Sequence, residues 1–449
     1  MADAKNPAML ELLQDLLKTA KSAGASEADA VLADSTSVSV NRRLGKPESV
    51  TRSEEAEIGL RVLVGKKQAI VSSSDRAPDA LHEMAARAVA MAKSVPEDPY
   101  AGIADAADLA KNFPDLDLYD ATGISLEKMN ELADRAEQAG RNVKGVTNSD
   151  GAECGMGRET VYYAATNGFA GGYSSSGFSL SVSVIAGTGM AMETDYAFDN
   201  ACFLNDMKAP EDIGRDAGIR ATQALNPRKA ATCQVPVVFD WRVSAGLIGS
   251  LANAITGSAV ARGTTFLKDK MGKKIFSESV TVTDDPFLKR GPRSRPFDAE
   301  GLTPQRRAII DKGVLTGWLL DLSSARQLNL KPTGNAARSS SSPPAPRPAN
   351  FTLQNGTQSV EEIIAAIDNG FFVTKMMGSG GNPVTGDYSR GASGFWIEKG
   401  KIAYPVSEVT IAGNLMDMWL NITPANDLQI HTGVDAPTLR VENMTVAGS

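Results

Sequence analysis

The apolar positions near the start of the chain change period between neighbouring segments. Leu10, Leu13, Leu17 and Ala20 recur every three or four residues and predict one face of an α-helix. The following segment ADAVLADSTSVSVNRR alternates apolar and polar residues, which predicts a strand over 28–43. Segment 56–74, AEIGLRVLVGKKQAIVSSS, predicts a hairpin that turns near Gly65.

The rest of the first half alternates helical and strand patterns. Pro78 opens a predicted helix that runs to about Lys93, and Ser125 caps another. The inner face of this second helix carries Leu126, Met129, Leu132 and Ala136. Strand signals dominate 154–198, with a turn at Asn167-Gly168 and alternation through Phe178, Leu180, Val182 and Val184. A helix over 209–225 then ends before Pro227.

A short apolar strand and a helix of small residues follow this break. Val237, Val238 and Phe239 predict the strand, and Asp240 can cap the helix. The helix offers Ser244, Ser250, Asn253 and Thr256 but no group that titrates near neutral pH. The small side chains of this helix predict that it is buried and packed closely against another element, so that larger side chains would overpack the contact. The small positions are Ala245, Gly246, Gly249, Ala252, Asn253 and Gly257.

The last third is rich in strands and turns. Segment 339–350, SSSSPPAPRPAN, has low complexity. Ser359 and Glu362 form a capping box before a short helix, and Lys399-Gly400 suits a hairpin turn between strands. Segments 370–383, 391–406 and 438–446 supply strands. The pattern predicts an α+β fold with two domains, an α/β N-terminal half over 1–227 and a β-rich C-terminal half over 228–449.

Composition and charge exclude several classes of protein. The 449 residues are 42% apolar and 22% charged, which is ordinary for a globular protein, and the net charge of −7 disfavours nucleic acid. We interpret Arg290, Arg293 and Arg295 as a solvated loop. The start lacks the apolar stretch of a signal peptide, and 243–261 is too polar to span a membrane. Three widely spaced cysteines suit reduced thiols and a cytoplasmic location.

The familiar catalytic and metal motifs are not completed. His82-Glu83 begins like HExxH, but Ala86 and Arg87 stand where the second histidine would be, so His82 is interpreted as an ordinary helix residue. His431 lies in a polar segment, and Cys154, Cys202 and Cys233 have no metal-binding spacing. The sequence therefore offers no catalytic residue and no metal ligand set.

The glycine-rich segment MMGSGGNPVTGDYSRGASGF, 376–395, is more informative. Glycines let a second backbone approach closely, and the flanking strands could pair with an extended peptide. An ordinary hairpin loop explains the same pattern equally well.

Five stretches together resemble the PmbA/TldD family, also called modulators of DNA gyrase, and within it the TldE (PmbA) branch. They are GLRVLVGKKQAIVSSSD at 59–75, ATNGFAGGYSSSGFSLSVSVIA at 165–186, PTGNAARSSSSPPAPRPANFTL at 332–353, the segment 370–415 and APTLRVENMTVAG at 436–448. The resemblance implies a two-part fold and a cytoplasmic two-subunit zinc peptidase that degrades or matures small unfolded peptides.

In this family the TldD partner carries zinc through HExxxH, on the helix after the first strand of its C-terminal half, and through a cysteine before the final strand. The matching helix here, 244–254, has neither histidine nor glutamate, and PANDLQIHTGVD at 424–435 has no cysteine. The resemblance therefore implies a non-catalytic subunit without a cofactor and a zinc-bearing TldD-like partner in a heterodimer. The sequence does not set the oligomeric state of the isolated chain, for which a homodimer is one of the open alternatives. The candidate peptide-binding residues are Arg338, Gly378, Gly380, Gly381, Tyr388 and Arg390.

Two other functions stay open on the sequence. One is a peptide-binding or scaffold protein that acts without any peptidase. The other is a stand-alone hydrolase, for which Ser250, Tyr388 or Asp387 would have to serve. A partner chain with HExxxH would favour the two-subunit peptidase.

Overall fold

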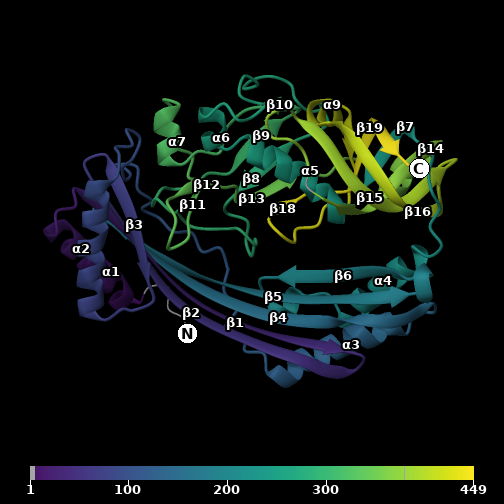
Figure 1. Cartoon of the computed structure of the whole chain (residues 1–449), viewed down its shortest axis with the longest axis horizontal. Coiled ribbons are helices and arrows are strands. Elements are labelled where there is room, and N and C mark those ends of the chain that lie inside the picture. The colour runs from purple at the N-terminus through teal and green to yellow at the C-terminus, as the bar shows by residue number, and fades with distance from the viewer. Residues whose placement is uncertain (1–5, 379, 449) are drawn as a thin grey trace.

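The computed structural model describes residues 6–378 and 380–448, and its first six strands form one antiparallel sheet. The strand order is β3-β2-β1-β4-β5-β6. Figure 1 shows this sheet as a curved arch, with the C-terminal half of the chain lying above its concave face. The strands are β1 (Glu27–Arg43), β2 (Lys46–Val64), β3 (Lys67–Ser73), β4 (Val146–Ala165), β5 (Ala170–Ala186) and β6 (Glu193–Ala201).

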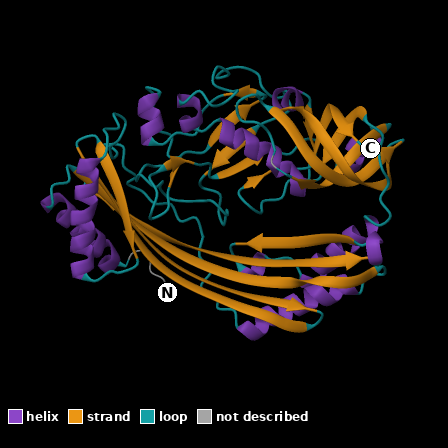
Figure 2. Cartoon of the chain, in the orientation of Figure 1, coloured by secondary structure: helices purple, strands orange, loops and turns teal. Residues whose placement is uncertain are grey.

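Four helices cover the convex face of the arch in two pairs (Figure 2). They are α1 (Pro7–Ser22), α2 (Pro78–Ser94), α3 (Leu126–Arg141) and α4 (Pro210–Gln223). Alternation along β1 explains the arrangement: Ala30 and Leu32 pack beneath α1 and α2, and Val40 packs beneath α3 and α4. Asp29 and Val31, which alternate with Ala30 and Leu32 along β1, face the concave side of the sheet.

The predicted elements of this half form, with two local differences. The hairpin turns at Gly65 and at Asn167-Gly168, and the Ser125 cap, are confirmed. Leu126, predicted on the inner face of α3, is 44% exposed, because it lies in the first turn before the helix reaches the sheet. β2 also begins ten residues earlier than expected, since 46–57 is polar and exposed on both faces and leaves no alternation to detect.

From β7 onward the chain builds a closed barrel. Its strands run in the order β16-β15-β14-β7-β19, and β16 pairs again with β19 to close the ring, for example Ile411 with Val446. These strands are β7 (Cys233–Phe239), β14 (Asn369–Met377), β15 (Asp387–Glu398), β16 (Lys401–Asn414) and β19 (Leu439–Ala447), and β17 (Ile422–Pro424) extends β19 on its outer side. The predicted α+β class with a β-rich C-terminal half is confirmed.

A second, smaller sheet lies beside the barrel with strand order β10-β9-β8-β13-β18. Its members are β8 (Val282–Asp285), β9 (Arg307–Asp311), β10 (Val314–Leu315), β13 (Asn350–Leu353) and β18 (Val434–Asp435). The helices of this half are α5 (Trp241–Ala254), α6 (Gly257–Ala261), α7 (Leu322–Gln327), α8 (Val360–Ala365) and α9 (Leu415–Leu420). Among the described residues, no helix has the length and apolar character needed to cross a membrane.

The low-complexity segment is ordered and joins the two halves. Residues 336–348, which we call the strap, contain the paired strands β11 (Ala336–Ala337) and β12 (Ala345–Pro346). The carbonyl of Ser340 lies so close to Gly59 of β2 that a Cβ added there would be 2.0 Å from its oxygen. The backbone of the strap therefore packs directly on the concave face of the sheet.

Candidate functional site

A cleft of 1220 Å³ separates the concave face of the arch from the C-terminal half. Its floor is formed by β1, β4, β5 and β6, and its ceiling by the loop 288–295 together with 347–348 and 430–431. This volume exceeds the range of about 300–1,000 Å³ that is usual for small-molecule pockets. The cleft is therefore large enough to hold an extended chain.

The floor is polar because alternate residues of the long strands point into the cleft. On β4, Glu153, Gly155, Gly157 and Glu159 line it, whereas Cys154 belongs to the core beneath α3 and α4. On β5, Ser175, Gly177 and Ser179 line it, and Ser176 and Phe178 between them also contribute, so the alternation is incomplete there. The sequence analysis missed this floor, although ECGMGRE at 153–159 carries a period of two that could have indicated it.

The ceiling contains the three arginines that the sequence analysis interprets as a solvated loop. Arg290 and Arg293 are exposed, as expected, and Arg295 is half-buried. Arg290, Arg293 and Arg295 all line the cleft. Arg290 pairs with Asp117 at 2.7 Å and with Asp206 at 2.8 Å, so the loop is tied to the N-terminal half. The sequence could not indicate these two ion pairs, because the acidic partners are distant in the chain.

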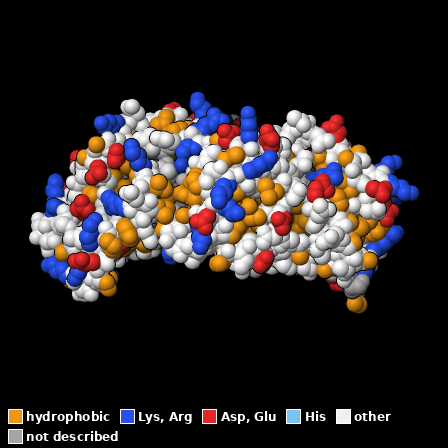
Figure 3. All heavy atoms as spheres, turned by 90° about the horizontal axis from the view of Figure 1, so that it is seen from above, with side chains coloured by type: hydrophobic (Ala, Val, Ile, Leu, Met, Phe, Trp, Pro, Cys, Tyr) orange, Lys and Arg blue, Asp and Glu red, His pale blue; other side chains and the backbone are white. Residues whose placement is uncertain are grey.

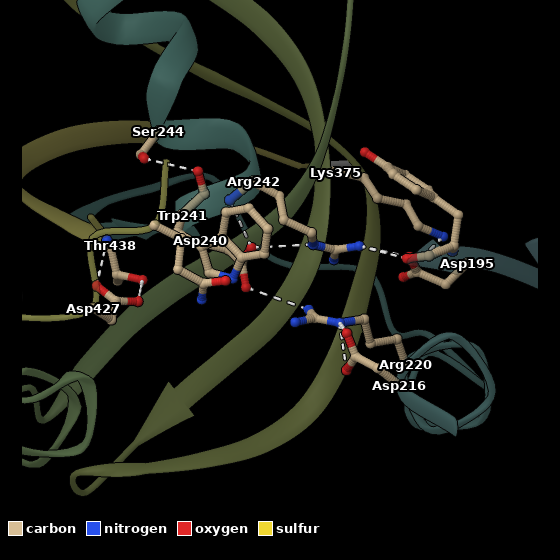
Figure 4. A network of polar contacts seen from close by, with 12 residues as sticks. Asp195, Asp216, Arg220, Asp240, Trp241, Arg242, Ser244, Lys375, Asp427 and Thr438 are labelled. Atoms are coloured by element: carbon tan, nitrogen blue, oxygen red, sulfur yellow. Dashed lines mark hydrogen bonds and ion pairs between the residues drawn. The ribbon is translucent and has the colours of Figure 1, made fainter. Parts of the chain in front are cut away.

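At one end of the cleft a buried ionic network holds α5 against the arch (Figure 4). Arg242, in the first turn of α5, lies 3.1 Å from Asp195 of β6 and 3.2 Å from Asp240, the residue that caps α5. Arg220 of α4 reaches Asp240 at 3.4 Å, and Lys375 of β14 reaches Asp195 at 3.5 Å. Elements from both halves therefore meet at the start of α5.

His431 closes the same end of the cleft. Its ring stacks on Trp241 at 5.0 Å and meets the edge of Phe198 at 5.6 Å, and it is buried rather than in an open polar loop. Burial lowers the pKa of His431, and the charge of Lys208 lowers it further, although Asp199 and Asp435 partly oppose this. The ring is therefore neutral at physiological pH.

Helix α5 is amphipathic rather than buried all round. Of the small positions expected to be packed, Ala252 is buried and Gly257, just after the helix, is too, with a Cβ there only 2.3 Å from Ser324 Oγ; Gly246 and Asn253 are exposed, which corrects the expectation for them. Leu247, Ile248 and Leu251 are fully buried, whereas Gly246 is exposed and a Cβ added at Gly249 would meet nothing within 4 Å. Ser244 is buried and donates a hydrogen bond to the carbonyl of Ala436 at 3.2 Å. Gly246, Gly249, Ser250 and Asn253 thus form an outward face of the helix.

The glycine-rich hairpin lies beside that outward face. A Cβ at Gly246 would be 3.7 Å from Arg390 Nη1, and one at Gly380 would be 3.8 Å from the Tyr388 ring. Tyr388 donates a hydrogen bond to the sulfur of Met376 at 3.3 Å, and burial raises the pKa of Tyr388 to about 12. Gly380, Tyr388 and Arg390 therefore lie together in front of α5.

The other two hairpin glycines have different surroundings. Gly378 has a φ of +82° and open space around it, whereas a Cβ at Gly381 would be 2.6 Å from Leu415. Gly380, Gly381 and Tyr388 line a hollow of 420 Å³ at the hairpin. A peptide could contact this hollow through its backbone.

Arg338 is not part of this group. Its side chain is 1% exposed and pairs with Asp29, which also binds Arg61 of β2, with Arg61 Nε donating to it at 2.8 Å. Burial alone would raise the pKa of Asp29, but the charges of Arg61 and Arg338 outweigh burial and lower the pKa. Arg338 therefore anchors the strap to the arch, and its charge is already neutralised inside the protein.

The side chains present do not fit a zinc ion. The outward face of α5 carries no imidazole, thiolate or carboxylate, and the described residues contain no group of three or more His, Cys, Asp or Glu side chains that could hold a metal.

The other side chains that the sequence analysis considered for catalysis or metal binding lie apart from one another. His82 is exposed on α2, where its Nδ1 lies 2.8 Å from the carbonyl of Pro78. Ser250 donates a hydrogen bond to Gly246 of its own helix at 3.1 Å, and Asp387 accepts one from Thr385 at 2.7 Å.

Comparison with known proteins gives full-length matches. Models of the PmbA/TldA metallopeptidase match in three parts, domain 1 at 28–92, the central domain at 119–225 and the C-terminal domain at 232–448. Metalloprotease PmbA of Escherichia coli O157:H7 is 37% identical over 98% of this chain and 97% of its own length.

Two solved structures share the fold along nearly the whole chain. A proposed modulator of DNA gyrase from Bacteroides thetaiotaomicron superposes with a TM-score of 0.91 at 26% identity, covering both chains completely. TldE from Thermococcus kodakarensis superposes with a TM-score of 0.87 at 22% identity, covering 97% of this chain and all of its own. The arch and the barrel are therefore a shared architecture.

Proposed function

Because this chain belongs to the PmbA/TldD metallopeptidase family, we propose that it is the non-catalytic subunit of a two-subunit zinc peptidase that acts on small unfolded peptides. The observation that carries the proposal is the outward face of α5. In the family's zinc-bearing subunit the helix after the first C-terminal strand supplies HExxxH, and here that helix presents Gly246, Gly249 and Ser250.

Small residues on this face suit a wall of a peptide chamber. Gly246 leaves room beside Arg390, and Gly380 leaves room beside Tyr388, so an extended backbone can pass without side-chain clashes. The zinc ion, and the water that it activates, would come from a TldD-like partner subunit in a heterodimer. The cleft under the arch would hold the part of the peptide that extends away from the reacting bond.

The proposal also assigns the assembly to the cytoplasm. Cys154, Cys202 and Cys233 are all free thiols in the structure, as expected for a reducing compartment. Burial raises the pKa of each of the three, and it raises that of Cys154 to about 11, so none of them is a reactive thiolate at neutral pH.

Copurification with the HExxxH paralogue from the same genome tests the proposal. We expect a stable heterodimer, zinc in the partner alone by elemental analysis, and cleavage of an unfolded peptide by the mixture but not by this chain. Peptide binding without any zinc-bearing partner would instead favour the scaffold function. Cleavage by this chain alone would refute the non-catalytic role.

Gly380→Val provides a second, more local test. The variant should fold normally, because an added Cβ at this position makes ordinary contacts of 3.8 and 4.0 Å with Tyr388 and Arg390. It should lower the peptidase rate of the heterodimer by filling the space in front of α5. An unchanged rate together with an unchanged melting curve would exclude the hairpin from the peptide path.

A further inference from the structure

Three guanidinium groups converge on the ceiling of the cleft without an acidic partner. We call Arg293, Arg295 and Arg347 the arginine wall; all three line the cleft. None forms an ion pair with any residue that the structure describes, whereas Arg290 of the same loop pairs with both Asp117 and Asp206. On the outer surface of the C-terminal half, by contrast, basic and acidic side chains are interspersed (Figure 3).

The individual contacts leave most of the donors of the wall free. Arg293 donates from Nε to the carbonyl of Thr432 at 2.9 Å, and Arg295 donates from Nη2 to the carbonyl of Arg347 at 3.3 Å. The Nε of Arg295 is buried and has no hydrogen-bond partner. The exposed guanidinium of Arg347 makes no hydrogen bond within the described part of the chain. An arginine guanidinium group has five N–H donors, and one whose donors lack partners is suited to bind an anion.

The three charges also repel one another. Burial lowers the pKa of Arg293, and the positive charges of Arg347 and Arg295 lower it further, with Asp435 opposing them. Asp284 also opposes them, and both Asp284 and Asp298 interact electrostatically with Arg295, so these carboxyl groups offset part of the repulsion although none forms an ion pair with the wall. An incoming anion would offset more of it. An extended ligand with a negative group would relieve this repulsion.

The floor decides which kind of anion fits. Glu153 and Glu159 face the cleft without ion pairs in the described structure, and Tyr173 lies within reach of the charges of both Arg295 and Glu159. A phosphate backbone carries a negative charge on every nucleotide and would be repelled by this acidic floor. A peptide can carry one carboxylate toward the ceiling and uncharged backbone across the serines and glycines of the floor.

We propose that the arginine wall binds a carboxylate of an extended peptide held in the cleft, so that this subunit selects peptides by an acidic group. The inference rests on the proposed peptide-binding function. Guanidinium groups bind carboxylates in bidentate geometry with charge-assisted hydrogen bonds. The carboxylate can be the C-terminus of the peptide or the side chain of an Asp or Glu residue, and the experiment separates the two.

The test measures fluorescence anisotropy with the full chain and a rhodamine-labelled peptide of about ten residues, built from Ala and Ser with one internal Asp. Three further peptides carry an amidated C-terminus, Asn in place of Asp, or both changes. We expect loss of the bound carboxylate to weaken binding about tenfold, as for a charged hydrogen bond. Whichever single change has this effect identifies the source of the carboxylate.

Arg347→Gln is the variant of choice, because its guanidinium has no internal contact to lose. It should bind the unmodified peptide about tenfold more weakly and should no longer distinguish the peptides. Arg262→Gln removes an exposed charge at the end of α6, outside the cleft, and is the matched control. This control should keep both the affinity and the discrimination.

The outcomes separate the two levels of the argument. If none of the peptides binds, the peptide-binding function and the inference both fail. Binding of all four peptides with equal affinity would keep the function and overturn the arginine wall as a carboxylate site, as would an Arg347→Gln variant that still discriminates. A single-stranded oligonucleotide that displaces the peptide at lower concentration than an acidic peptide does would also overturn it.

Discussion

The guanidinium of Arg242 lies 3.1 Å from the carboxylate of Asp195, and their side chains are 2% and 3% exposed. Arg242 belongs to α5 and Asp195 to β6, so this buried contact ties the barrel half to the arch (Figure 4). A charge that loses its partner in such surroundings stays desolvated and unpaired, and this is far more costly than the pair itself is favourable.

We therefore expect Arg242→Met to lower the free energy of unfolding by about 3 kcal/mol, because Asp195 and Asp240 would both lose their nearer cation and keep only Lys375 at 3.5 Å and Arg220 at 3.4 Å. Urea unfolding followed by tryptophan fluorescence measures the change. Arg306→Met removes an exposed arginine that lies 3.2 Å from Asp285, and should cost less than about 1 kcal/mol. Equal effects of the two substitutions would contradict the structural role of the network.

Gly59→Ala tests the contact between the strap and the arch. The new Cβ would lie 2.0 Å from the carbonyl oxygen of Ser340, so the strap must move and the adjoining Arg338–Asp29 pair must open. We expect a loss of about 1–3 kcal/mol and faster proteolysis within 336–348. Gly157→Ala in β4 is the matched control, since nothing lies within 4 Å of its Cβ. A strap that is equally protected in both variants would disprove this contact.

Two substitutions in α5 should have opposite outcomes. Leu247→Ala empties a fully buried position and should cost about 2–5 kcal/mol. Gly249→Leu adds a side chain where the structure has open space, so the stability should stay the same or rise by up to about 1 kcal/mol through helix propensity. Thermal unfolding of both variants checks this. A strongly destabilised Gly249→Leu would mean that this face is packed after all.

The stability of the protein should fall as the pH drops below about 6.5, the ordinary pKa of histidine. The folded state lowers the pKa of His431, mainly through burial. In acid, the imidazole therefore binds a proton in the unfolded chain while it is still unprotonated in the folded chain. The contribution of His431 to the free energy of unfolding is therefore fully present above pH 6.5. It is lost as the pH falls from 6.5 to the pKa of His431 in the folded state, by at most about 1.4 kcal/mol per pH unit.

Replacement of the two histidines separates this effect from general acid sensitivity. His431→Phe keeps a ring between Trp241 and Phe198 and should flatten the stability profile between about pH 5 and 7. His82→Gln changes an exposed residue and should leave the slope as it is. Urea unfolding midpoints measured across this pH range check the prediction. If both variants kept the pH dependence of the parent protein, His431 would not be the group that causes the loss of stability in acid.

Local chemistry made much of the secondary structure predictable. Ser359 and Glu362 form the predicted capping box, and Lys399-Gly400 turns the predicted hairpin, because both depend on residues within four positions of each other. The α+β class followed from the same signals. The closed barrel did not, because the pairing of Ile411 with Val446 depends on contacts that no short pattern encodes.

The candidate site was predictable to the extent that its residues are close in sequence. Gly380, Tyr388 and Arg390 share one hairpin and do lie together. Arg338 came from the same family resemblance, but its partner Asp29 is 309 residues away, and that contact could not be foreseen. The arginine wall escaped detection for the same reason, since Arg347 meets Arg293 and Arg295 only after the loop folds over the arch.

The position of β7 in the barrel has a consequence for synthesis on the ribosome. β7 is the first barrel strand to be synthesised, yet one of its neighbours is β19, near the end of the chain. The β7–β19 ladder, in which Phe239 pairs with Leu439, can form only after β19 has been synthesised. Until then an apolar strand with a free edge is exposed in a nascent chain whose arch is already complete, and such edges recruit other chains. The partner that holds the start of α5, Asp195 of β6, is by contrast made before β7, so the anchor of the helix that follows β7 precedes the strand that completes its ladder.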